Sequence, residues 1–416
     1  MQLFFYNIFL ALYTFGIRVT ALFNKKAKQW LAGRKNILRI AKERLADNKE
    51  QRIWVHCSSL GEFEQGRPLI EAIKKQYPAY KIVLTFFSPS GYEVRKDYKY
   101  ADYIFYLPMD GRKTAEEFIG MVNPKLAIFV KYEFWHYYLD QLRKRNIPTV
   151  LVSAAFRPSQ AFFKWHGGLF RNMLQCFTLI FVQDVESKRL LQTIGIDDNV
   201  LLSGDTRYDR VSEIAEIAKK FPLIEKFKGK DCLLIAGSTW PDDEKLLKKI
   251  LPTLPDDWGL IIAPHEINSN HIEYLQNLFE SHCVLYSELS TEPKGFRVLI
   301  IDNIGMLSSL YSYGEIAYIG GGFQKGGIHN VLEPAVFGLP VFFGPRYDKF
   351  IEAKALVSHQ FAFPVSNVTE FNNLLQQLIH DEIHLKALQK SIRAYVSSQV
   401  GAADKIMQEL SARWLR

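Results

Sequence analysis

The chain has 416 residues, of which 48% are hydrophobic and 23% are charged, and its formal net charge is +8. This composition excludes a disordered chain, and the length favours two domains. The basic balance favours an anionic membrane surface or a phosphorylated substrate. It does not favour nucleic acid, because the sequence has neither a zinc-finger spacing nor basic residues interleaved with a stacking platform.

The first segment is strongly apolar. Residues 1–17 carry no charge and are rich in Phe, Leu and Tyr, whereas Arg18 and a basic cluster from Lys25 to Lys35 follow. A transmembrane helix needs about 20 apolar residues, a length reached only by continuing to Phe23. The segment lacks a signal-peptide cleavage site. We therefore expect an anchor that spans the bilayer or lies in its interface, with the rest of the chain on the cytoplasmic side; an ordinary core helix is the alternative.

Apolar runs then alternate with helical patterns, which predicts a parallel sheet. The strands expected in this half are Ile53–His56, Ile82–Phe86, Tyr103–Leu107, Leu126–Val130, Thr149–Ser153, Leu179–Val182 and Val200–Leu202. Helices are expected at Pro68–Tyr77 and Gly111–Met121.

A polar stretch, Asp209–Lys230, is expected to link this half to a second one. The strands expected there are Cys232–Ala236, Gly259–Ala263, Val298–Ile301, Glu315–Ile319 and Pro340–Phe343. Amphipathic closing helices follow over Leu385–Leu415. Two doubly wound halves would enclose a ligand cleft.

Four separated cysteines show no CxxC spacing, which predicts a reduced cytosolic chain without disulfides or a zinc site. These residues are Cys57, Cys176, Cys232 and Cys283.

The most informative motif is the Ser/Gly turn after the first expected strand, from His56 to Arg67. Glu62 would lie in the first turn of the next helix, where free backbone N–H groups and the helix dipole favour the ionised carboxylate. A base at neutral pH is one interpretation. The other is a capping box of Ser59 and Glu62, in which the carboxylate only reaches back to the cap backbone.

The second half has a similar turn, Gly237-Ser238-Thr239-Trp240-Pro241, whose backbone donors suit a phosphate. Thr239 with Asp242 would alternatively form a capping box. His265 ends the next strand, and an isolated histidine in that position is more often structural than functional.

Glycine clusters at Gly320–Gly322 and Gly326–Gly327 favour close approach of a ligand to the backbone. Asn330 is expected to open a helix, so that Glu333 one turn later could accept the hydroxyls of a ribose. Asn330 and Glu333 also fit a capping box, but a cap does not require the preceding glycines. The sequence has no Asp-x-Asp triplet, so we expect neither a metal nor a cofactor.

Taken in order, the motifs resemble those of the 3-deoxy-D-manno-octulosonic acid (Kdo) transferases. The residues that carry the resemblance are Ser58–Glu62, Gly66-Arg67, Ser88–Gly91, Tyr132–Trp135, Gly204–Asp209, Gly237–Thr239 and Gly326–Glu333. The resemblance implies an α/β GT-B fold of two Rossmann-like domains with a membrane helix. It also implies transfer of Kdo from CMP-Kdo to a lipid A precursor (lipid IVA) at the inner membrane, in lipopolysaccharide biosynthesis. The domains would be a membrane anchor (1–23), an acceptor-binding domain (24–210), a donor-binding domain (211–395) and a C-terminal helix (396–416).

By the same resemblance, Glu62 matches the general base and Glu133 a carboxylate that supports the transition state. Arg207 stands where many members have Lys, a cation of different hydrogen-bonding geometry. The motif before His265 is shorter here than in the family. The turns and the resemblance together assign CMP binding to Ser238, Thr239, Pro264, His265, Asn303, Ile304, Gly305, Gly321, Gly322, Asn330, Val331, Leu332 and Glu333. Acceptor binding falls on Ser59, Gly61, Arg67, Ser90 and Gly91.

The implied reaction is a single inverting displacement in which Glu62 deprotonates the acceptor hydroxyl while CMP leaves. Arg207 and the helix start after Asn330 would neutralise the departing phosphate. Two alternatives keep the same fold. A UDP-sugar epimerase would act on a soluble substrate and would not need the apolar N-terminus, and a non-catalytic membrane scaffold would turn over no donor.

Overall fold

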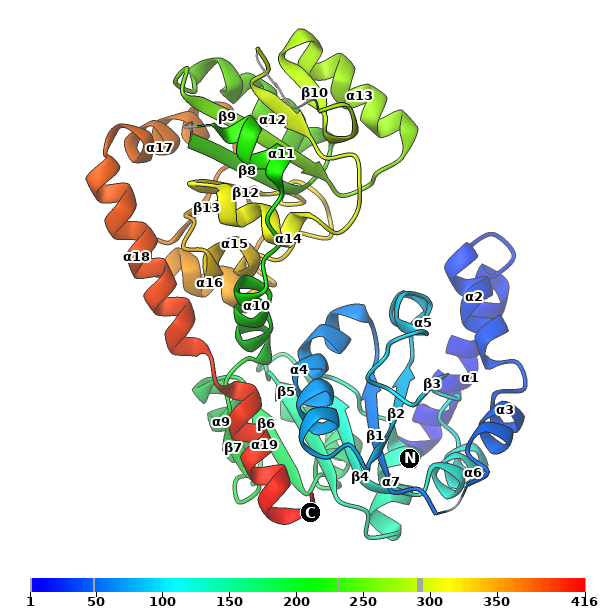
Figure 1. Cartoon of the computed structure of the whole chain (residues 1–416). Coiled ribbons are helices and arrows are strands. Elements are labelled where there is room, and N and C mark those ends of the chain that lie inside the picture. Colours follow the sequence, from blue (N-terminus) through cyan, green and yellow to red (C-terminus); the bar gives the residue numbers. More distant parts are fainter. Residues whose placement is uncertain (1, 48, 230–231, 290–294, 416) are drawn as a thin grey trace. The chain divides into compact units, whose positions relative to one another are not determined.

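The computed structural model describes residues 2–47, 49–229, 232–289 and 295–415; Met1, Lys230 and Arg416, which bound three segments named above, lie outside the described residues. Contacts divide the chain into two units. The first domain comprises Met1–Arg210 with Gln399–Arg416, and the second comprises Val211–Ser398. Each is built on one seven-stranded sheet (Figure 1).

The sheet of the first domain is entirely parallel, in the order β3-β2-β1-β4-β5-β6-β7. Because β1 lies between β2 and β4, the strand order reverses there, and ligands bind at such a switch point outside the carboxyl ends of the strands. The strands are β1 (Arg52–Cys57), β2 (Lys81–Phe86), β3 (Tyr103–Tyr106), β4 (Pro124–Val130), β5 (Thr149–Ala154), β6 (Leu179–Val182) and β7 (Val200–Leu202).

Helices cover both faces of this sheet, because successive strand residues point to opposite sides. In β1, Trp54 packs into one apolar layer, while Ile53 and Val55 pack into the other. The last helix, α19, belongs to the second layer through Ile406 and Leu410. The helices are α1 (Gln2–Thr20), α2 (Lys25–Arg34), α3 (Ile37–Arg44), α4 (Leu60–Gln76), α5 (Pro89–Arg95), α6 (Arg112–Val122), α7 (His136–Lys144), α8 (Gly168–Leu174), α9 (Val185–Gln192), α10 (Thr206–Glu216) and α19 (Ala402–Arg413).

The sheet of the second domain is also parallel, in the order β10-β11-β9-β8-β12-β13-β14, with its switch point between β8 and β12. Its strands are β8 (Cys232–Thr239), β9 (Trp258–Pro264), β10 (Cys283–Leu285), β11 (Val298–Ile300), β12 (Ile316–Ile319), β13 (Val341–Phe343) and β14 (Ala362–Pro364). Its helices are α11 (Pro222–Lys228), α12 (Pro241–Ile250), α13 (Ser269–Phe279), α14 (Leu307–Leu310), α15 (Leu332–Val336), α16 (Ile351–Ser358), α17 (Val368–His380) and α18 (Glu382–Gln399).

All the expected strands are present, and the prediction of two parallel α/β sheets is confirmed. The edge strands β10 and β14 were not predicted, because three residues are too few to show a periodic pattern. The stretch Asp209–Lys230, expected to link the two halves, contains the boundary between the two units after Arg210, and the end of α10 and helix α11 occupy most of it.

Helix α4 begins at Leu60, where the capping box of Ser59 and Glu62 places its start, although the periodic helical pattern was expected only from Pro68. Glycine at position 66 weakens the helical pattern, but it lets α4 approach the sheet: a Cβ there would lie 2.9 Å from Val130 Cγ2. Tertiary packing therefore extends this helix toward its N-terminus.

Candidate active site

Glu62 lies in the first turn of α4, directly after the carboxyl end of β1. The Ser59 backbone N–H donates to Glu62 Oε2 at 3.0 Å, so the capping interaction that the sequence allowed is present. A carboxylate has a second oxygen and several lone pairs, so this bond is compatible with proton transfer at the same group.

The electrostatics of Glu62 differ from the sequence prediction. Burial, followed by the negative charge of Glu133, raises the pKa of Glu62 to about 7, against the lowering effect of the Ser58 and Ser59 N–H groups and of Lys131. The expectation that the helix start would keep this carboxylate ionised was therefore wrong, because desolvation outweighs the hydrogen bonds. A pKa near neutrality is well matched to a general base.

Glu133 follows β4, the strand beside β1, which is why two carboxylates distant in sequence meet at the switch point. Its side chain is buried. His56 Nε2 and Trp135 Nε1 both lie 2.8 Å from Glu133 Oε2. Lys131, at the turn between β4 and Glu133, has a φ of +68°, a strained conformation for a lysine that is typical of functional turns.

A buried chain of hydrogen bonds leads to Glu133 from the neighbouring strands. Trp54 Nε1 donates to Thr85 Oγ1 at 2.8 Å, and Thr85 Oγ1 lies 2.8 Å from His56 Nδ1. His56 Nδ1 also lies 3.2 Å from the Thr85 carbonyl oxygen, so β2 holds the imidazole through two contacts. These contacts thus fix the position of the Glu133 carboxyl group beside Glu62.

Arg207 lies at the start of α10 and is paired with Asp205. Its Nη2 is 2.6 Å from Asp205 Oδ2. The start of α10 is fixed to α4, because the Thr206 hydroxyl donates to the Gln65 carbonyl at 2.7 Å. Arg207 and Glu62 both act electrostatically on Tyr132, so the structure brings this cation to the same edge of the sheet.

The predicted acceptor-binding residues lie around the ends of β1 and β2. Arg67 is engaged within α4, where its Nε is 2.7 Å from Glu71 Oε1. Ser90 bonds to Ser88 at the start of α5. Gly91 has a packing role, since a Cβ there would lie 2.3 Å from the Phe86 ring. Gly61 and Ser59 belong to the turn that carries Glu62.

In the second domain, Ser238 and Thr239 end β8 at its switch point. Ser238 has a positive φ of +53°, and Lys131 at the first switch point also has a positive φ. The predicted capping box of Thr239 and Asp242 was wrong by one residue. The Trp240 N–H donates to Asp243 Oδ2 at 3.0 Å, because the strand continues through Thr239 and α12 begins at Pro241.

Two histidines and a tryptophan stack at this edge. The His265 ring lies 4.8 Å from the ring of Trp240 and 4.3 Å from that of His329, centroid to centroid. Burial, with the charge of His265, lowers the pKa of His329 to about 4, and burial also lowers the pKa of His265. Both rings are therefore neutral at pH 7. Pro264 ends β9 immediately before the stack.

The first glycine cluster follows β12 and fits against its neighbours. A Cβ at Gly320 would lie 2.2 Å from the Ser238 carbonyl oxygen, and one at Gly322 would lie 2.5 Å from the backbone of Gly344. Gly321 has a φ of +92°, and its N–H donates to Asp243 Oδ2 at 2.9 Å. These glycines first of all allow the switch-point turns to pack together.

The second cluster leads into α15, which begins at Leu332 and not at Asn330 as expected. The Asn330 side-chain oxygen accepts from the Leu332 N–H at 3.1 Å, and its amide donates to Glu333 Oε1 at 3.0 Å. Val331 and Leu332 are fully buried, backbone included, so neither offers a surface to a ligand. Asn303, Ile304 and Gly305 form an exposed loop after β11.

Within the described residues, no three His, Cys, Asp or Glu side chains are grouped so as to hold a metal ion.

Comparison with known proteins shows which family the chain resembles. Residues 35–210 match the family described as 3-deoxy-D-manno-octulosonic-acid transferase (kdotransferase). The chain is 29% identical to the 3-deoxy-D-manno-octulosonic acid transferase of Haemophilus influenzae, over 77% of each chain. It is 28% identical to that of Aquifex aeolicus, over 82% of this chain and 89% of the relative. The chain is thus similar to Kdo transferases over most of its length, and these relatives support its being an enzyme, a glycosyltransferase.

A bifunctional glycosyltransferase/methyltransferase of Fusobacterium nucleatum is 27% identical over 80% of this chain, which spans about half the length of that relative. Among solved structures, a UDP-GlcNAc 2-epimerase from Neisseria meningitidis superposes with a TM-score of 0.60 at 17% identity, over 87% of this chain and all of that one. Acinetobacter baumannii MurG gives 0.53 at 12% identity, over 87% and 99%. These similarities show the fold alone, which is the GT-B-like α/β fold expected from the sequence.

Sequence reasoning did not assign roles to six residues that the structure places at these edges: His56, Thr85, Trp135, Trp240, Asp243 and His329. His56 and Trp135 lay inside motifs already recognised, so their position at strand ends was an available signal. Thr85 lies within β2, and only the pairing of β1 with β2 brings it beside His56.

Proposed function

We propose that this protein is a Kdo transferase that moves Kdo from CMP-Kdo to the lipid A precursor lipid IVA, by an inverting displacement that needs no metal. The observation that carries the proposal is the coupling of Glu62 and Glu133 at the first switch point. One carboxylate is fixed by two ring nitrogens, and its neighbour titrates near neutral pH.

In this mechanism Glu62 removes the proton of an acceptor hydroxyl as the bond between the anomeric carbon and the CMP phosphate breaks. General-base assistance of this kind contributes about 10²–10⁴ in rate. The phosphate is a good leaving group that needs no proton, and a cation such as Arg207 would offset its developing charge. Glu133 would stabilise the positive charge that develops on the sugar.

The donor is assigned to the second domain. Neutral aromatic rings at His265, Trp240 and His329 offer a flat surface to a pyrimidine base. The family, the apolar helix α1 and the basic charge support action at the cytoplasmic face of the inner membrane.

The decisive experiment is mass analysis of the products formed from the full-length protein, CMP-Kdo and a tetra-acylated lipid A precursor, with and without EDTA. We expect a mass increase of one or more Kdo units, unchanged by EDTA. A parallel incubation with UDP-GlcNAc tests for epimerisation. No transfer from CMP-Kdo, or transfer abolished by EDTA and restored by a divalent metal, would contradict the proposal.

A further inference from the structure

Helix α1 is fastened to the first domain along a narrow stripe. Leu10 and Ala21 are buried. Near the N-terminal end of α1 the Tyr6 hydroxyl donates to Asp110 Oδ2 at 2.6 Å. Further along the helix the Tyr13 ring packs edge-on against Trp30 of α2. The stripe therefore extends along most of α1.

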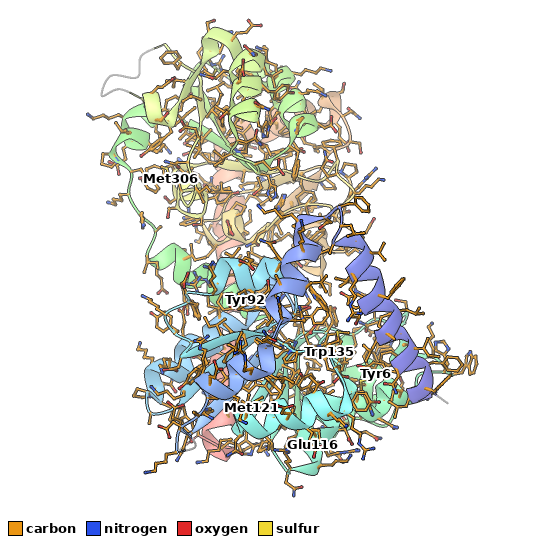
Figure 2. The ribbon with its side chains drawn as sticks, turned by 90° about the vertical axis from the view of Figure 1, so that its right-hand side faces the viewer. Tyr6, Tyr92, Glu116, Met121, Trp135 and Met306 are labelled. Atoms are coloured by element: carbon orange, nitrogen blue, oxygen red, sulfur yellow. The ribbon has the colours of Figure 1, made fainter. Side chains whose placement is uncertain are left out.

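The remainder of α1 is apolar and exposed, and its side chains project outward from the first domain (Figure 2). The exposed large apolar residues of α1 and the turn after it are Leu3, Phe4, Phe5, Ile8, Phe9, Leu12, Tyr13, Phe15, Val19, Leu22 and Phe23. By length and composition α1 could also cross a bilayer.

Its docking argues against crossing. Nineteen helical residues extend about 28 Å, close to the thickness of the hydrocarbon core. If α1 stood upright in the bilayer, the polar groups packed along it, including Asp110 and Tyr137, would enter the hydrocarbon at a cost of several kcal/mol each. An orientation parallel to the membrane surface buries the apolar face and keeps these groups in water.

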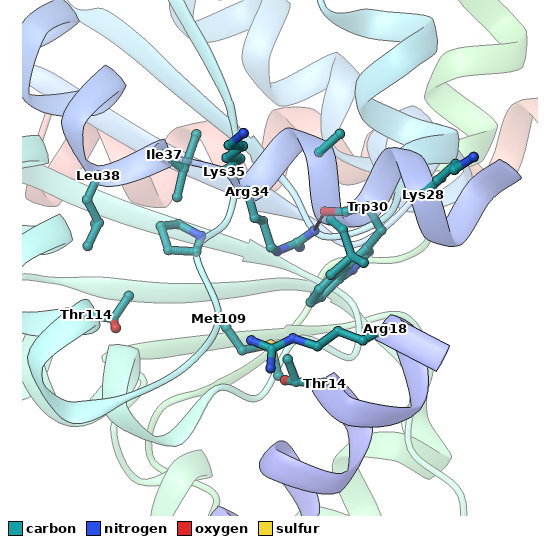
Figure 3. Close-up of a pocket in the computed structure, with 13 residues that line it drawn as sticks. Thr14, Arg18, Lys28, Trp30, Arg34, Lys35, Ile37, Leu38, Met109 and Thr114 are labelled. Atoms are coloured by element: carbon teal, nitrogen blue, oxygen red, sulfur yellow. Dashed lines mark hydrogen bonds between the residues drawn. The ribbon is translucent and has the colours of Figure 1, made fainter. Parts of the chain in front are cut away.

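A pocket of about 640 Å³ lies between the C-terminal part of α1, helices α2 and α3, and the segment after β3 (Figure 3). Exposed Arg18, Lys28 and Lys35 line its rim, and none of the thirteen lining residues is acidic. Among the described residues the side chains of these three cations have no hydrogen-bond or ion-pair partner. The pocket thus carries three uncompensated positive charges beside the apolar face.

Trp30 also lines this pocket, and only 5% of the residue is exposed. Its indole nitrogen is buried and has no hydrogen-bond partner in the described structure, so a ligand in the pocket contacts the indole ring rather than this N–H. Arg34, whose guanidinium lies 3.8 Å over the Trp30 ring, is already committed to three backbone carbonyls.

We propose that this pocket binds the phosphate of an anionic membrane phospholipid and so holds α1 flat in the membrane interface. Arg18, Lys28 and Lys35 supply the charge, and the exposed face of α1 enters the acyl region. The inference depends on neither the donor nor the acceptor assigned above.

Binding of the full-length protein to lipid vesicles tests whether the positive charges of Arg18, Lys28 and Lys35 attract an anionic membrane. A basic residue near an anionic surface contributes about a fivefold factor in partitioning. We therefore expect R18Q/K28Q/K35Q to bind vesicles of phosphatidylcholine with about a third phosphatidylglycerol about 100-fold more weakly than the unaltered chain does. The matched control K249Q/K390Q/K405Q removes the same charge from exposed positions on α12, α18 and α19, and should change binding by less than about fivefold. Equal binding to pure phosphatidylcholine, or equal losses in the two triple variants, would overturn the proposal.

Two further measurements keep the test independent of folding. The Trp30 indole N–H resonance, assigned with W30F, should shift on addition of short-chain phosphatidylglycerol and not with inorganic phosphate at the same concentration. Spin labels at positions 5 and 22 should report similar shallow depths in the bilayer. An equal shift with inorganic phosphate would show a general anion site, and labels on opposite sides of the bilayer would show a spanning helix; either result contradicts the proposal.

Discussion

The two domains have the same architecture, a seven-stranded parallel sheet with one switch point. They differ in the side chains that lie at the strand ends there. In the first domain the strand ends carry ionisable groups, Glu62 and Glu133, supported by buried polar side chains. In the second they carry glycines, a neutral aromatic stack and Asp243, which backbone and tyrosine donors satisfy. A shared fold therefore fixes where a ligand lies, whereas the side chains at the strand ends determine whether that edge suits proton chemistry or ligand binding.

The largest expected effect separates these two roles. Replacing Glu62 with Gln removes the proton acceptor but keeps a capping side chain, so kcat should fall about 10²–10⁴-fold while CMP binding, measured by calorimetry, is unchanged. Glu117→Gln, an exposed carboxylate on α6, serves as the matched control and should retain activity. Full activity of the Glu62→Gln enzyme would remove the first domain from the chemistry.

The second prediction examines the glycines of the second domain. Gly322→Ala places a methyl group 2.5 Å from backbone atoms that cannot move independently, so we expect a loss of about 3 kcal/mol or more in stability and weakened CMP binding. Gly326→Ala meets nothing within 4 Å and should change neither. Thermal unfolding and CMP titration of the two variants provide the measurement. Similar behaviour of both would mean that the cluster is not required for packing.

The third prediction concerns the hydrogen-bond chain behind Glu133. Thr85→Val keeps the shape but removes the hydroxyl that orients His56, which leaves Nδ1 and the Trp54 N–H without this partner. A buried unsatisfied group costs about 1–3 kcal/mol, so activity should fall by about tenfold or more. The acid limb of its pH–rate profile should shift, a change that a merely structural loss would not produce. Thr178→Val, at the β5–β6 pair away from the site, is the control.

The pH dependence of activity tests the role of the ionisable groups in the first domain. Activity should rise with pH through an apparent pKa of about 7, since only the ionised Glu62 can accept a proton. Glu133→Gln removes the negative charge beside Glu62. Because that charge disfavours ionisation of Glu62, the pKa of the Glu62 carboxyl should be lower in this variant. Carbon-13 NMR of labelled glutamates reports this titration even if the variant is slow. An unchanged or higher pKa would show that the two groups are not coupled.

The smallest effect is on stability. Because the pKa of Glu62 is raised in the fold above its ordinary value, the folded state binds this proton more tightly, and stability falls as pH rises from about 4.5 through 7. Glu62→Gln should therefore be more stable than the unaltered chain at pH 8, by on the order of 1 kcal/mol. At pH 4 the difference should disappear. Chemical denaturation at the two pH values measures it, and a variant that is less stable at pH 8 would contradict the assignment.

The sequence by itself predicted the two parallel sheets, the strands of both switch points and the turns that follow them. Strand identity is a local property, because buried parallel strands are continuous apolar runs and the turns after them are marked by Ser, Gly and Pro. For the same reason the motif from His56 to Arg67 is recognisable from its residues alone.

Only the tertiary structure showed that Glu62 and Glu133 act on each other, because their proximity depends on the pairing of β1 with β4. It also raised the pKa of Glu62 above what the helix start alone predicts, since desolvation depends on everything that packs around the helix start. The hydrogen bonds that join Trp54 and His56 through Thr85, and the docking of α1 on the first domain, also depend on contacts between segments that lie far apart in sequence.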